Sequence, residues 1–424
     1  MEHYDLIVVG GGQAGCAAAL AAARADVRVL LIEAGGALGG AAVNCLITPY
    51  MPNHTRIPDA CGNKQDVELT QGIYREMYEA LNRDEIYGLS WHRVNIPEES
   101  MKVIYDRKMK EAGVTVLFHA TLSQVDRDGD AVTAVHVATV GGEYVFGADT
   151  FIDATGDATL TALAGSPFRL GRPADSLCQP MTLCFRIGNV DMKEFAAHRD
   201  EITPLYREWQ AAGKLKNPRE NVLIFTTCLP NVLHFNTTRV VKLNPTDPFD
   251  VSRAEAEARE QVVEMVHFLK TNFAAFAHAD LLMTAASIGV RESRMIDARH
   301  ILTGEELMAG TKFPDAIAAG NYDIDIHSPD GSGTSHYYFP EGVYYTIPYR
   351  SLLPRDLSNL LVVGRAIGAT HEAQASIRIM PICSATGEAA GVAAAVAKEC
   401  GVAAADVDTD LLQDRLRKAG AFLG

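Results

Sequence analysis

Two short apolar runs separated by an alanine-rich stretch open the chain. Tyr4–Val9 and Val27–Ile32 are rich in aliphatic and β-branched side chains, which is typical of strands buried in a parallel sheet. The segment between them, from about Ala14 to Ala25, has the length and apolar character of a helix packed on that sheet. The pattern predicts a strand–helix–strand unit at the start of the chain.

Alternating apolar and polar positions follow between residues 114 and 153. Val114–His119, Ser123–Arg127, Ala131–Val140 and Glu143–Phe146 alternate around glycine turns and lead into a strand at Asp149–Asp153. This pattern predicts a β-meander. Near the end of the chain, residues 359–363 predict another strand and residues 384–398 an alanine-rich helix.

The middle of the chain has a different pattern from about residue 165 onwards. Strand-like runs occur at Gln179–Ile187 and Asn221–Phe235, and Ser252–Phe268 predicts a long helix that begins with a capping box of Ser252 and Glu255. Residues 325–340, rich in glycine and polar side chains, predict an ordered loop. Before this region, helical spacing predicts helices over residues 65–84 and 98–111.

A glycine fingerprint connects the first strand to the first helix. Gly10, Gly12 and Gly15 occupy the three positions of G-x-G-x-x-G, and Glu33 ends the second strand. The first glycine permits a tight turn, the second lets backbone approach a pyrophosphate, and the third lets helix and strand pack closely. The helix N-terminus favours phosphate, and Glu33 is placed to bind a ribose. The sequence therefore predicts a dinucleotide site.

The rest of the chain favours FAD over NAD as that dinucleotide. A second glycine-rich stretch follows Glu33, and a meander leads to Ala154-Thr155-Gly156-Asp157, an arrangement that resembles the FAD-binding fold of glutathione-reductase-type flavoproteins. Only one such glycine fingerprint occurs, so we do not expect a second dinucleotide-binding domain for a nicotinamide cofactor. The predicted FAD-binding residues are Gly10, Gly12, Gln13, Ala14, Gly15, Glu33, Ala34, Gly39, Gly40, Asn44, Ala154, Thr155, Gly156, Asp157, Gly364 and Arg365.

Several segments together resemble one family, the FAD-dependent oxidoreductases related to succinate dehydrogenase and fumarate reductase flavoproteins. Many related proteins carry an acid at the position of Arg365, so the chain departs from the family there. The resemblance implies the fold and noncovalent FAD, since no histidine between residues 34 and 53 is present to attach a flavin. The matching segments are Val8–Gly15, Glu33–Gly40, Ala154–Asp157, Arg291–Arg294, Asp325–His327, Ile347–Leu352, Asn359–Arg365 and Arg378–Pro381.

The expected fold class is α/β, a Rossmann-like FAD-binding domain with a parallel sheet and meander, plus an inserted α+β substrate domain. The expected boundaries are 1–165 and 347–424 for the two parts of the FAD-binding domain and 166–346 for the substrate domain. This organisation places FAD between the two ends of the chain.

Charge and composition limit the kinds of partner that we expect the protein to bind. Lys and Arg number 38 against 53 Asp and Glu, a formal charge of −15, which argues against nucleic acid as a partner. No uncharged apolar run is long enough to span a membrane, so no membrane insertion is expected. The absence of Cys-x-x-Cys pairs and of metal-ligand spacing indicates neither disulfides nor a metal, and the expected location is the cytoplasm. The sequence is compatible with a homo-oligomer.

Four residues are the candidates for catalysis: Arg291, His327, His371 and Arg378. Arg291 suits an anionic or polyhydroxylated substrate group, and the alternative for it is a structural ion pair with Glu292 or another acid. Arg378 suits a substrate oxyanion or the negative charge of reduced flavin. Each histidine suits proton transfer, and the alternative for His327 is stabilisation of its loop. We expect all four to converge at the junction of the two domains, where pockets are common.

The leading functional hypothesis is a dehydrogenase or reductase that moves a hydride between FAD and a small polar, anionic or sugar-derived substrate, with an electron donor or acceptor that the sequence does not identify. Two alternatives are a flavoprotein monooxygenase and a redox-neutral lyase or isomerase that uses flavin transiently. A further alternative is a flavin-binding component of a larger complex.

Overall fold

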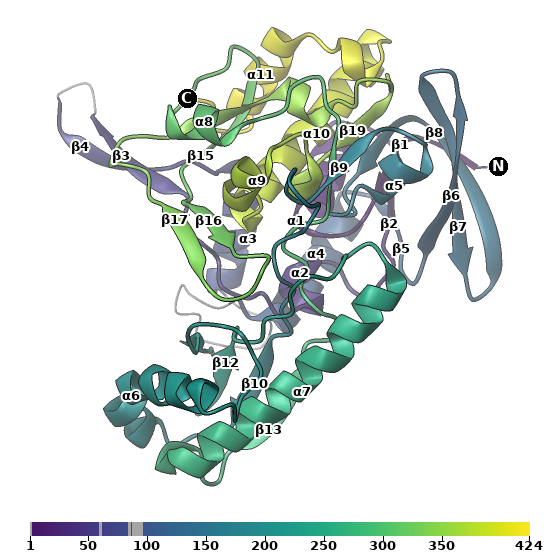
Figure 1. The fold of residues 1–424 in the computed structure, drawn as a ribbon. Helices are drawn as coiled ribbons and strands as arrows, with labels where there is room; N and C mark the ends of the chain where they lie inside the picture. Colours follow the sequence, from purple (N-terminus) through teal and green to yellow (C-terminus); the bar gives the residue numbers. More distant parts are fainter. Residues whose placement is uncertain (1, 59–61, 84–85, 87–95) are drawn as a thin grey trace.

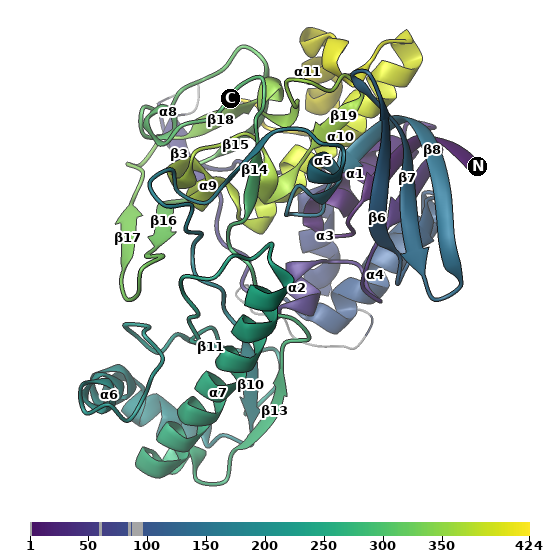
Figure 2. The ribbon, with the colours of Figure 1, turned by 45° about the vertical axis from the view of Figure 1, so that its right-hand side comes forward.

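The computed structural model describes residues 2–58, 62–83, 86 and 96–424. At its centre lies a mixed sheet with the strand order β5–β2–β1–β8–β7–β6, in which β19 also pairs with β8 (Figures 1 and 2). Strands β5, β2, β1, β8 and β19 run parallel, whereas β6, β7 and β8 form an antiparallel meander. The bounds are β1 (Glu2–Val9), β2 (Val29–Ile32), β5 (Thr115–Leu117), β6 (Thr121–Asp128), β7 (Ala131–Thr139), β8 (Gly142–Asp153) and β19 (Leu360–Val362).

The long strand β8 brings distant parts of the chain to one edge of this sheet. Asp153, its last residue, lies opposite Val9 of β1 on one side and opposite Val362 of β19 on the other. The turns that follow β1, β8 and β19 therefore leave the sheet together at the carboxyl ends of the parallel strands. In open α/β sheets this is the edge at which ligands bind.

The predicted meander is confirmed with two corrections. Val114–His119 contributes β5, which pairs in parallel with β2 and is not part of the meander. The two strands predicted within residues 143–153 are one continuous strand, β8, because its first half pairs with β7 and its second half with β19.

Helices α1 (Gln13–Ala23) and α10 (Met380–Cys400) pack against each other beside this sheet. A Cβ atom at Gly387 would lie 2.0 Å from the Ala14 carbonyl oxygen, and one at Gly391 would lie 2.2 Å from that of Ala18. Glycine at both positions is thus required for the close approach. Among the described residues, α10 alone is long and apolar enough to cross a membrane by length and composition, but 78% of its apolar window is buried inside the protein.

A second layer with its own core extends from the lower end of the molecule in Figures 1 and 2. Its four-stranded antiparallel sheet has the order β11–β12–β10–β13 and is accompanied by helices α6 and α7. Most residues of this second core fall between Met181 and Ile288. The bounds are β10 (Phe185–Gly188), α6 (Met192–Ala211), β11 (Ile224–Thr226), β12 (Leu233–Phe235), α7 (Pro248–Asn272) and β13 (Asp280–Thr284).

The segment that follows this layer packs on the first core. Ile317, Ile324 and Tyr345 are buried with residues of α1 and α10, although all three lie within the range predicted for the substrate domain. The strands of this segment form short antiparallel pairs: β14 pairs with β9, which precedes the second layer in the chain, β15 with β18 and β16 with β17. The bounds are β9 (Phe168–Leu170), β14 (Arg294–Ile296), β15 (Ala316–Gly320), β16 (Ile324–His327), β17 (Thr334–Tyr337) and β18 (Tyr345–Pro348).

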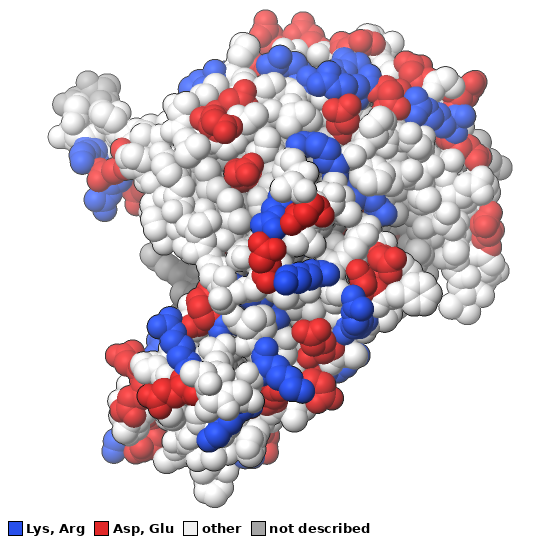
Figure 3. All heavy atoms as spheres, viewed as in Figure 1, with Lys and Arg blue, Asp and Glu red and all other residues white. Residues whose placement is uncertain are grey.

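The remaining elements are short strands and helices around the two layers. A β3–β4 hairpin projects from the left of the molecule in Figure 1. Figure 3 shows acidic and basic side chains interspersed over the face that it presents. The bounds are α2 (Ala41–Asn44), β3 (His54–Pro58), β4 (Lys64–Glu68), α3 (Gly72–Arg83), α4 (Glu98–Glu111), α5 (Thr159–Leu163), α8 (Gly304–Met308), α9 (His371–Ile377) and α11 (Thr409–Lys418).

Three local predictions are wrong. Residues 65–68 form a strand, and only Gly72–Arg83 of the predicted 65–84 helix is helical, with Asp84 outside the described residues. Helix α7 begins earlier than predicted, because the Asp247 carboxylate caps it and Pro248 occupies its first turn, while Ser252 lies inside the helix. Residues 325–340 contain the β16–β17 hairpin instead of a loop.

A buried carboxyl group joins α10 to the start of α3. The Glu388 side chain is almost fully buried, and its carboxylate accepts a hydrogen bond from the Ile73 backbone N–H at 3.0 Å. Burial raises the pKa of Glu388 from 4.5 to about 7, although the Ile73 hydrogen bond opposes the rise. The folded protein therefore binds this proton more tightly than the unfolded chain, and stability falls as pH rises from about 4.5 to about 7.

We expect Glu388→Gln to remove this pH dependence, because an amide oxygen accepts the same hydrogen bond without carrying a charge. Relative to wild type, the free energy of unfolding of the variant should rise by up to about 3 kcal/mol between about pH 5 and pH 8. Urea unfolding at the two pH values measures this difference. A difference that stays constant with pH would show that Glu388 does not titrate in this range.

Candidate functional site

The glycine turn after β1 is shaped by three different constraints. Gly10 has φ +104°, and a Cβ atom there would lie 2.5 Å from the Ala154 carbonyl oxygen. A Cβ atom at Gly15 would lie 1.8 Å from the Gly10 carbonyl oxygen. At Gly12 the nearest atom to such a Cβ is 3.9 Å away, so this glycine borders open space at the start of α1. That space, facing a helix N-terminus without a capping side chain, fits a pyrophosphate.

Glu33 is fixed at the end of β2 by two backbone donors. The N–H of Gly11 donates to one carboxylate oxygen and the N–H of Gly35 to the other, each at 2.7 Å. A carboxylate has about four acceptor positions, so both oxygens retain capacity for ribose hydroxyls. Ala34 follows directly, and the Asn44 side chain lies on the same side, since a Cβ at Gly35 would approach its Nδ2 at 3.4 Å.

We expect Glu33→Ala to weaken FAD binding by about 1–3 kcal/mol, the value of a hydrogen bond to a charged group. The variant also leaves the Gly11 and Gly35 N–H groups without their acceptor. Equilibrium dialysis of FAD against the apoprotein measures the change, with the exposed Glu143→Ala on the same sheet as control. Unchanged affinity in Glu33→Ala would remove Glu33 from the FAD site.

The second glycine stretch packs against the first. Gly40 has φ +54°, and a Cβ atom there would lie 2.7 Å from the Cα atom of Gly12. Gln13, the first residue of α1, directs its amide toward the Gly39 carbonyl oxygen and accepts a hydrogen bond from Tyr105 at 2.8 Å. The two glycine stretches thus form adjoining walls of the predicted FAD site.

Arg365, the position at which the chain departs from the family pattern, forms an ion pair with Asp157. Its Nε donates to the Gly156 carbonyl oxygen and its Nη2 to Asp157 Oδ1, both at 2.8 Å. Burial lowers the pKa of Arg365, but the charge of Asp157 outweighs it and holds that pKa above its ordinary value. Gly364 precedes this arginine at the end of β19, so the turns after β8 and β19 are joined by an ion pair. The basic residue is therefore accommodated by an acid supplied from the other turn.

These observations agree with FAD. The turn at Gly12 is open, Glu33 is held in place, and α10 presents an N-terminus that lacks both a side-chain cap and an acid in its first turn. The predicted FAD segments at Gly10–Gly15, Ala154–Asp157 and Gly364–Arg365 converge at one edge of the sheet.

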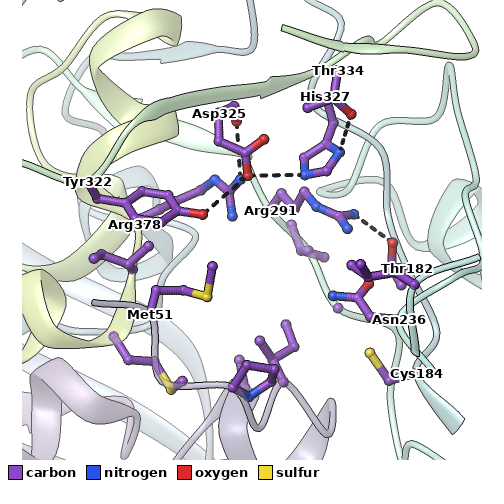
Figure 4. Close-up of a pocket in the computed structure, with 18 of the residues that line it drawn as sticks. Met51, Thr182, Cys184, Asn236, Arg291, Tyr322, Asp325, His327, Thr334 and Arg378 are labelled. Atoms are coloured by element: carbon purple, nitrogen blue, oxygen red, sulfur yellow. Dashed lines mark hydrogen bonds and ion pairs between the residues drawn. The ribbon is translucent and has the colours of Figure 1, made fainter. Parts of the chain in front are cut away.

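A cavity of about 480 Å³ lies between these segments and the second layer (Figure 4). Ala41, Arg365 and Met380 line it from the FAD-binding side, and Thr182 and Phe225 from the second layer. Three of the four candidate catalytic residues, Arg291, His327 and Arg378, also line it.

Arg378, Asp325 and His327 form a hydrogen-bonded chain along one wall. Asp325 Oδ2 lies 3.2 Å from Arg378 Nη2 and 3.4 Å from His327 Nε2 (Figure 4). The hydroxyl of Tyr322 approaches the same oxygen at 3.5 Å. Burial raises the pKa of Asp325, but the hydrogen bond from His327 and the charge of Arg378 outweigh it and hold the pKa well below its ordinary value. Asp325 is therefore ionised.

The position of the proton on His327 follows from its neighbours. Arg239 Nη2 lies 3.0 Å from His327 Nδ1, and a guanidinium only donates, so Nδ1 is the acceptor. The ring proton is then on Nε2, facing Asp325. Burial, together with the charge of Arg291, holds the pKa of His327 well below its ordinary value. His327 is neutral with its proton on Nε2.

Arg291 is buried at the centre of the cavity wall. It donates to the Pro180 carbonyl oxygen and the Thr182 hydroxyl, both at 2.6 Å, and both acceptors are uncharged. Burial and the neighbouring charges of Arg219 and Arg378 lower the pKa of Arg291 to about 9. The alternative prediction of an ion pair with Glu292 is wrong, because the Glu292 carboxylate is directed to His371.

His371 does not line this cavity. It is buried at the start of α9, where its Nδ1 lies 2.7 Å from Glu292 Oε1. Glu292 Oε2 also accepts from the backbone N–H of Gln179. A catalytic role for His371 stays a prediction, and the structure pairs it with Glu292, the residue that follows Arg291.

The structure adds residues to the cavity that the sequence did not indicate. Arg219 and Asn236 come from the second layer, and Tyr322 precedes β16. None of them belongs to a motif, and each reaches the cavity through packing of segments far apart in the sequence. Among the segments that line the cavity, a sequence signal was present for Arg291–Arg294, Asp325–His327, Asn359–Arg365 and Arg378–Pro381. Cys45 lies nearby, and burial raises the pKa of its thiol, which does not favour a reactive thiolate.

The sequence is similar to parts of two curated proteins. It is 30% identical over 137 residues to protein FixC of Azorhizobium caulinodans, covering 30% of this chain and 31% of FixC. It is 25% identical over 187 residues to glutathione reductase of Schizosaccharomyces pombe, covering 39% of each chain. The chain thus spans between 31% and 39% of the length of these curated relatives.

Solved structures with a similar arrangement have low sequence identity. A geranylgeranyl bacteriochlorophyll reductase-like protein from Thermoplasma acidophilum aligns with a TM-score of 0.47 at 12% identity, over 99% of this chain and 83% of the other. The p-nitrophenol 4-monooxygenase of Pseudomonas putida aligns with a TM-score of 0.46 at 11% identity, over 99% and 82%.

The fold and the dinucleotide turn define an enzyme that binds FAD. The sequence model of the family described as FAD dependent oxidoreductase matches residues 5–416, nearly the whole chain. The chain belongs to this FAD-dependent oxidoreductase family. The predictions of FAD as cofactor and of an oxidoreductase are confirmed.

Proposed function

We propose that the protein transfers a hydride between FAD and a small polar, anionic substrate held in the cavity. The observation that carries this proposal is one cavity lined both by segments proposed to bind FAD, at Ala41 and Arg365, and by two cations, the buried Arg291 and the half-buried Arg378. Residues 166–346 supply much of the opposite wall and act as the substrate domain. We further propose the cytoplasm as the location.

Each side chain has a distinct task in this proposal. When bound, FAD supplies the chemistry of hydride transfer at N5. Arg291 binds an anionic substrate group, since its guanidinium reaches the cavity and its described partners are neutral oxygens. Arg378 is held by Asp325 and also lines the cavity (Figure 4). His327 holds a proton at Nε2, and Asp325 fixes the direction of that proton.

Anaerobic incubation of the FAD-loaded enzyme with small anionic metabolites tests the proposal. We expect one of them to bleach the oxidised flavin, or to restore the colour of the flavin after chemical reduction. Product formation without change in flavin absorbance and without an external acceptor would favour the lyase or isomerase alternative. A strict requirement for O2 with hydroxylated product would favour the monooxygenase.

The depressed pKa of His327 leads to a prediction about pH. An ordinary histidine near pKa 6.5 gives kcat/KM a titration limb between about pH 6 and pH 8. Because the pKa of His327 lies well below that value, we expect kcat/KM to show no histidine limb in this range. A pH profile of kcat/KM checks this, and a limb near pH 6.5 that disappears in His327→Gln would contradict it.

A further inference from the structure

We propose that the substrate is a dianion, and that Arg219 and Arg291 together bind its two negative charges. This inference rests on the proposed function, because it names the charge of the substrate that the same cavity takes. It adds Arg219, a residue of the second layer, as a determinant of specificity.

Arg219 is buried without a full set of partners. Only 4% of it is exposed, its Nε donates to Asn221 Oδ1 at 3.1 Å, and its Nη1 is buried with no hydrogen-bond partner among the described residues. It lines the cavity together with Arg291. Burial, and then the charge of Arg239, lowers the pKa of Arg219 to about 10. The guanidinium is thus a buried donor with unused capacity at the cavity wall.

The other cations around the cavity are already neutralised. Arg378 pairs with Asp325 at 3.2 Å, Arg239 with Glu220 at 2.9 Å and Arg365 with Asp157 at 2.8 Å. Asp325 and Glu220 are the acidic residues that line the cavity, and both are used in these pairs. Within the described ranges no ion pair joins Arg219 or Arg291 to an acid. Two guanidinium charges therefore remain uncompensated.

Uncompensated buried charge favours a ligand of matching charge. An isolated buried cation is strongly disfavoured, and Arg219 and Arg291 also repel each other. A dianion relieves both charges, whereas a monoanion leaves one of them unpaired. Carboxylates and phosphate-type groups both match the planar donor geometry of a guanidinium, so the shared requirement is two negative charges. Apolar residues such as Ile47, Met51 and Phe225 line the remaining wall.

The test measures binding to the oxidised, FAD-loaded enzyme at fixed ionic strength, by flavin absorbance and by Tm. The probes are short straight-chain dicarboxylates and methylphosphonate, each compared with a monoanion of the same size, a monocarboxylate or the phosphonate monoester. We expect one dianion class to bind about ten- to a hundredfold more tightly than its monoanion. The class that shows this preference distinguishes a dicarboxylate substrate from a phosphorylated one.

Arg219→Gln separates a binding role from a structural one. We expect this variant to bind the dianion no more tightly than wild type binds the monoanion, with a ligand-free Tm that is unchanged or higher because a buried charge is removed. Arg253→Gln on α7 removes an equal but exposed charge and should bind like wild type.

Three results would overturn the inference: equal binding of dianions and monoanions by wild type, a lowered Tm with an unchanged binding ratio in Arg219→Gln, or the same loss of preference in Arg253→Gln. None of these readouts requires turnover. A failure here therefore leaves the redox proposal standing. Conversely, an absence of flavin reduction by any metabolite would reject the redox proposal without altering the binding result.

Discussion

Gly12→Val will yield a folded protein that does not hold FAD. Gly12 has φ −74° and ψ −174°, a conformation that valine adopts readily, and nothing lies within 3.9 Å of a Cβ atom there. The new side chain is therefore tolerated by the protein and projects into the open space at the start of α1. That space is where a pyrophosphate meets the helix N-terminus, so we expect FAD affinity to fall at least about a thousandfold, roughly 4 kcal/mol.

The ratio of flavin absorbance to protein absorbance after purification measures this loss. Gly331→Val is a matched control, because Gly331 also borders open space, with nothing within 4 Å of its added Cβ, but lies in the β16–β17 hairpin. The control should retain FAD. A normal flavin content in Gly12→Val would exclude the glycine turn as the pyrophosphate site.

Arg291→Ala will keep its FAD and lose at least about two orders of magnitude in kcat/KM. The substitution removes the guanidinium that reaches the substrate side of the cavity, and charged hydrogen bonds contribute about 1.5–3 kcal/mol each. Arg291 lies outside the glycine turn and outside the segments at residues 154–157 and 364–365, so its loss leaves the FAD site intact.

Two further variants make this result specific. Arg291→Met fills much of the vacated volume without charge and should lose as much activity as the alanine variant, which excludes a cavity effect. Arg253→Ala on α7 should behave like wild type, since its side chain is exposed. Full kcat/KM in Arg291→Ala would remove Arg291 from the substrate site.

Local sequence predicted most of the proposed FAD site. The constraints on Gly10, Gly12 and Gly15 act between neighbouring elements, so a short motif is sufficient to predict them. Glu33 was predicted in the same way, because it ends the strand that follows the motif. The proposed cofactor site thus follows from one strand–helix–strand unit together with the turns after the meander and after β19.

The substrate side depends on contacts that no local pattern reveals. Glu292 pairs with His371, 79 residues away, so it is not the partner of Arg291 that the alternative prediction offered. His371 is held at this carboxylate and does not line the cavity. Arg239, 88 residues from His327 in the chain, donates a hydrogen bond to its Nδ1 and thereby fixes its tautomer. Arg219 belongs to no recognisable motif, and the role proposed for it rests on its place in the cavity wall and on its Nη1, which has no partner among the described residues.

Errors in secondary structure have similar physical origins. The sequence around Ser252 has the spacing of a capping box, but the helix begins earlier because Asp247 caps it and Pro248 suits its first turn. Residues 65–68 have helical spacing, yet pairing with β3 makes them a strand. In both cases the secondary structure was determined by a residue or strand outside the local pattern, a cap in the first and a pairing strand in the second.

The most direct test of hydride transfer in this cavity is a kinetic isotope effect on the flavin itself. The anion identified by the anaerobic screen is prepared with deuterium at its reacting carbon, and the change in flavin absorbance is followed in a single turnover. For a substrate that reduces the flavin, we expect deuterium to slow bleaching several-fold in wild type and Arg291→Ala to bleach far more slowly with either isotope. Product formed at the normal rate while the flavin spectrum stays unchanged would contradict the account.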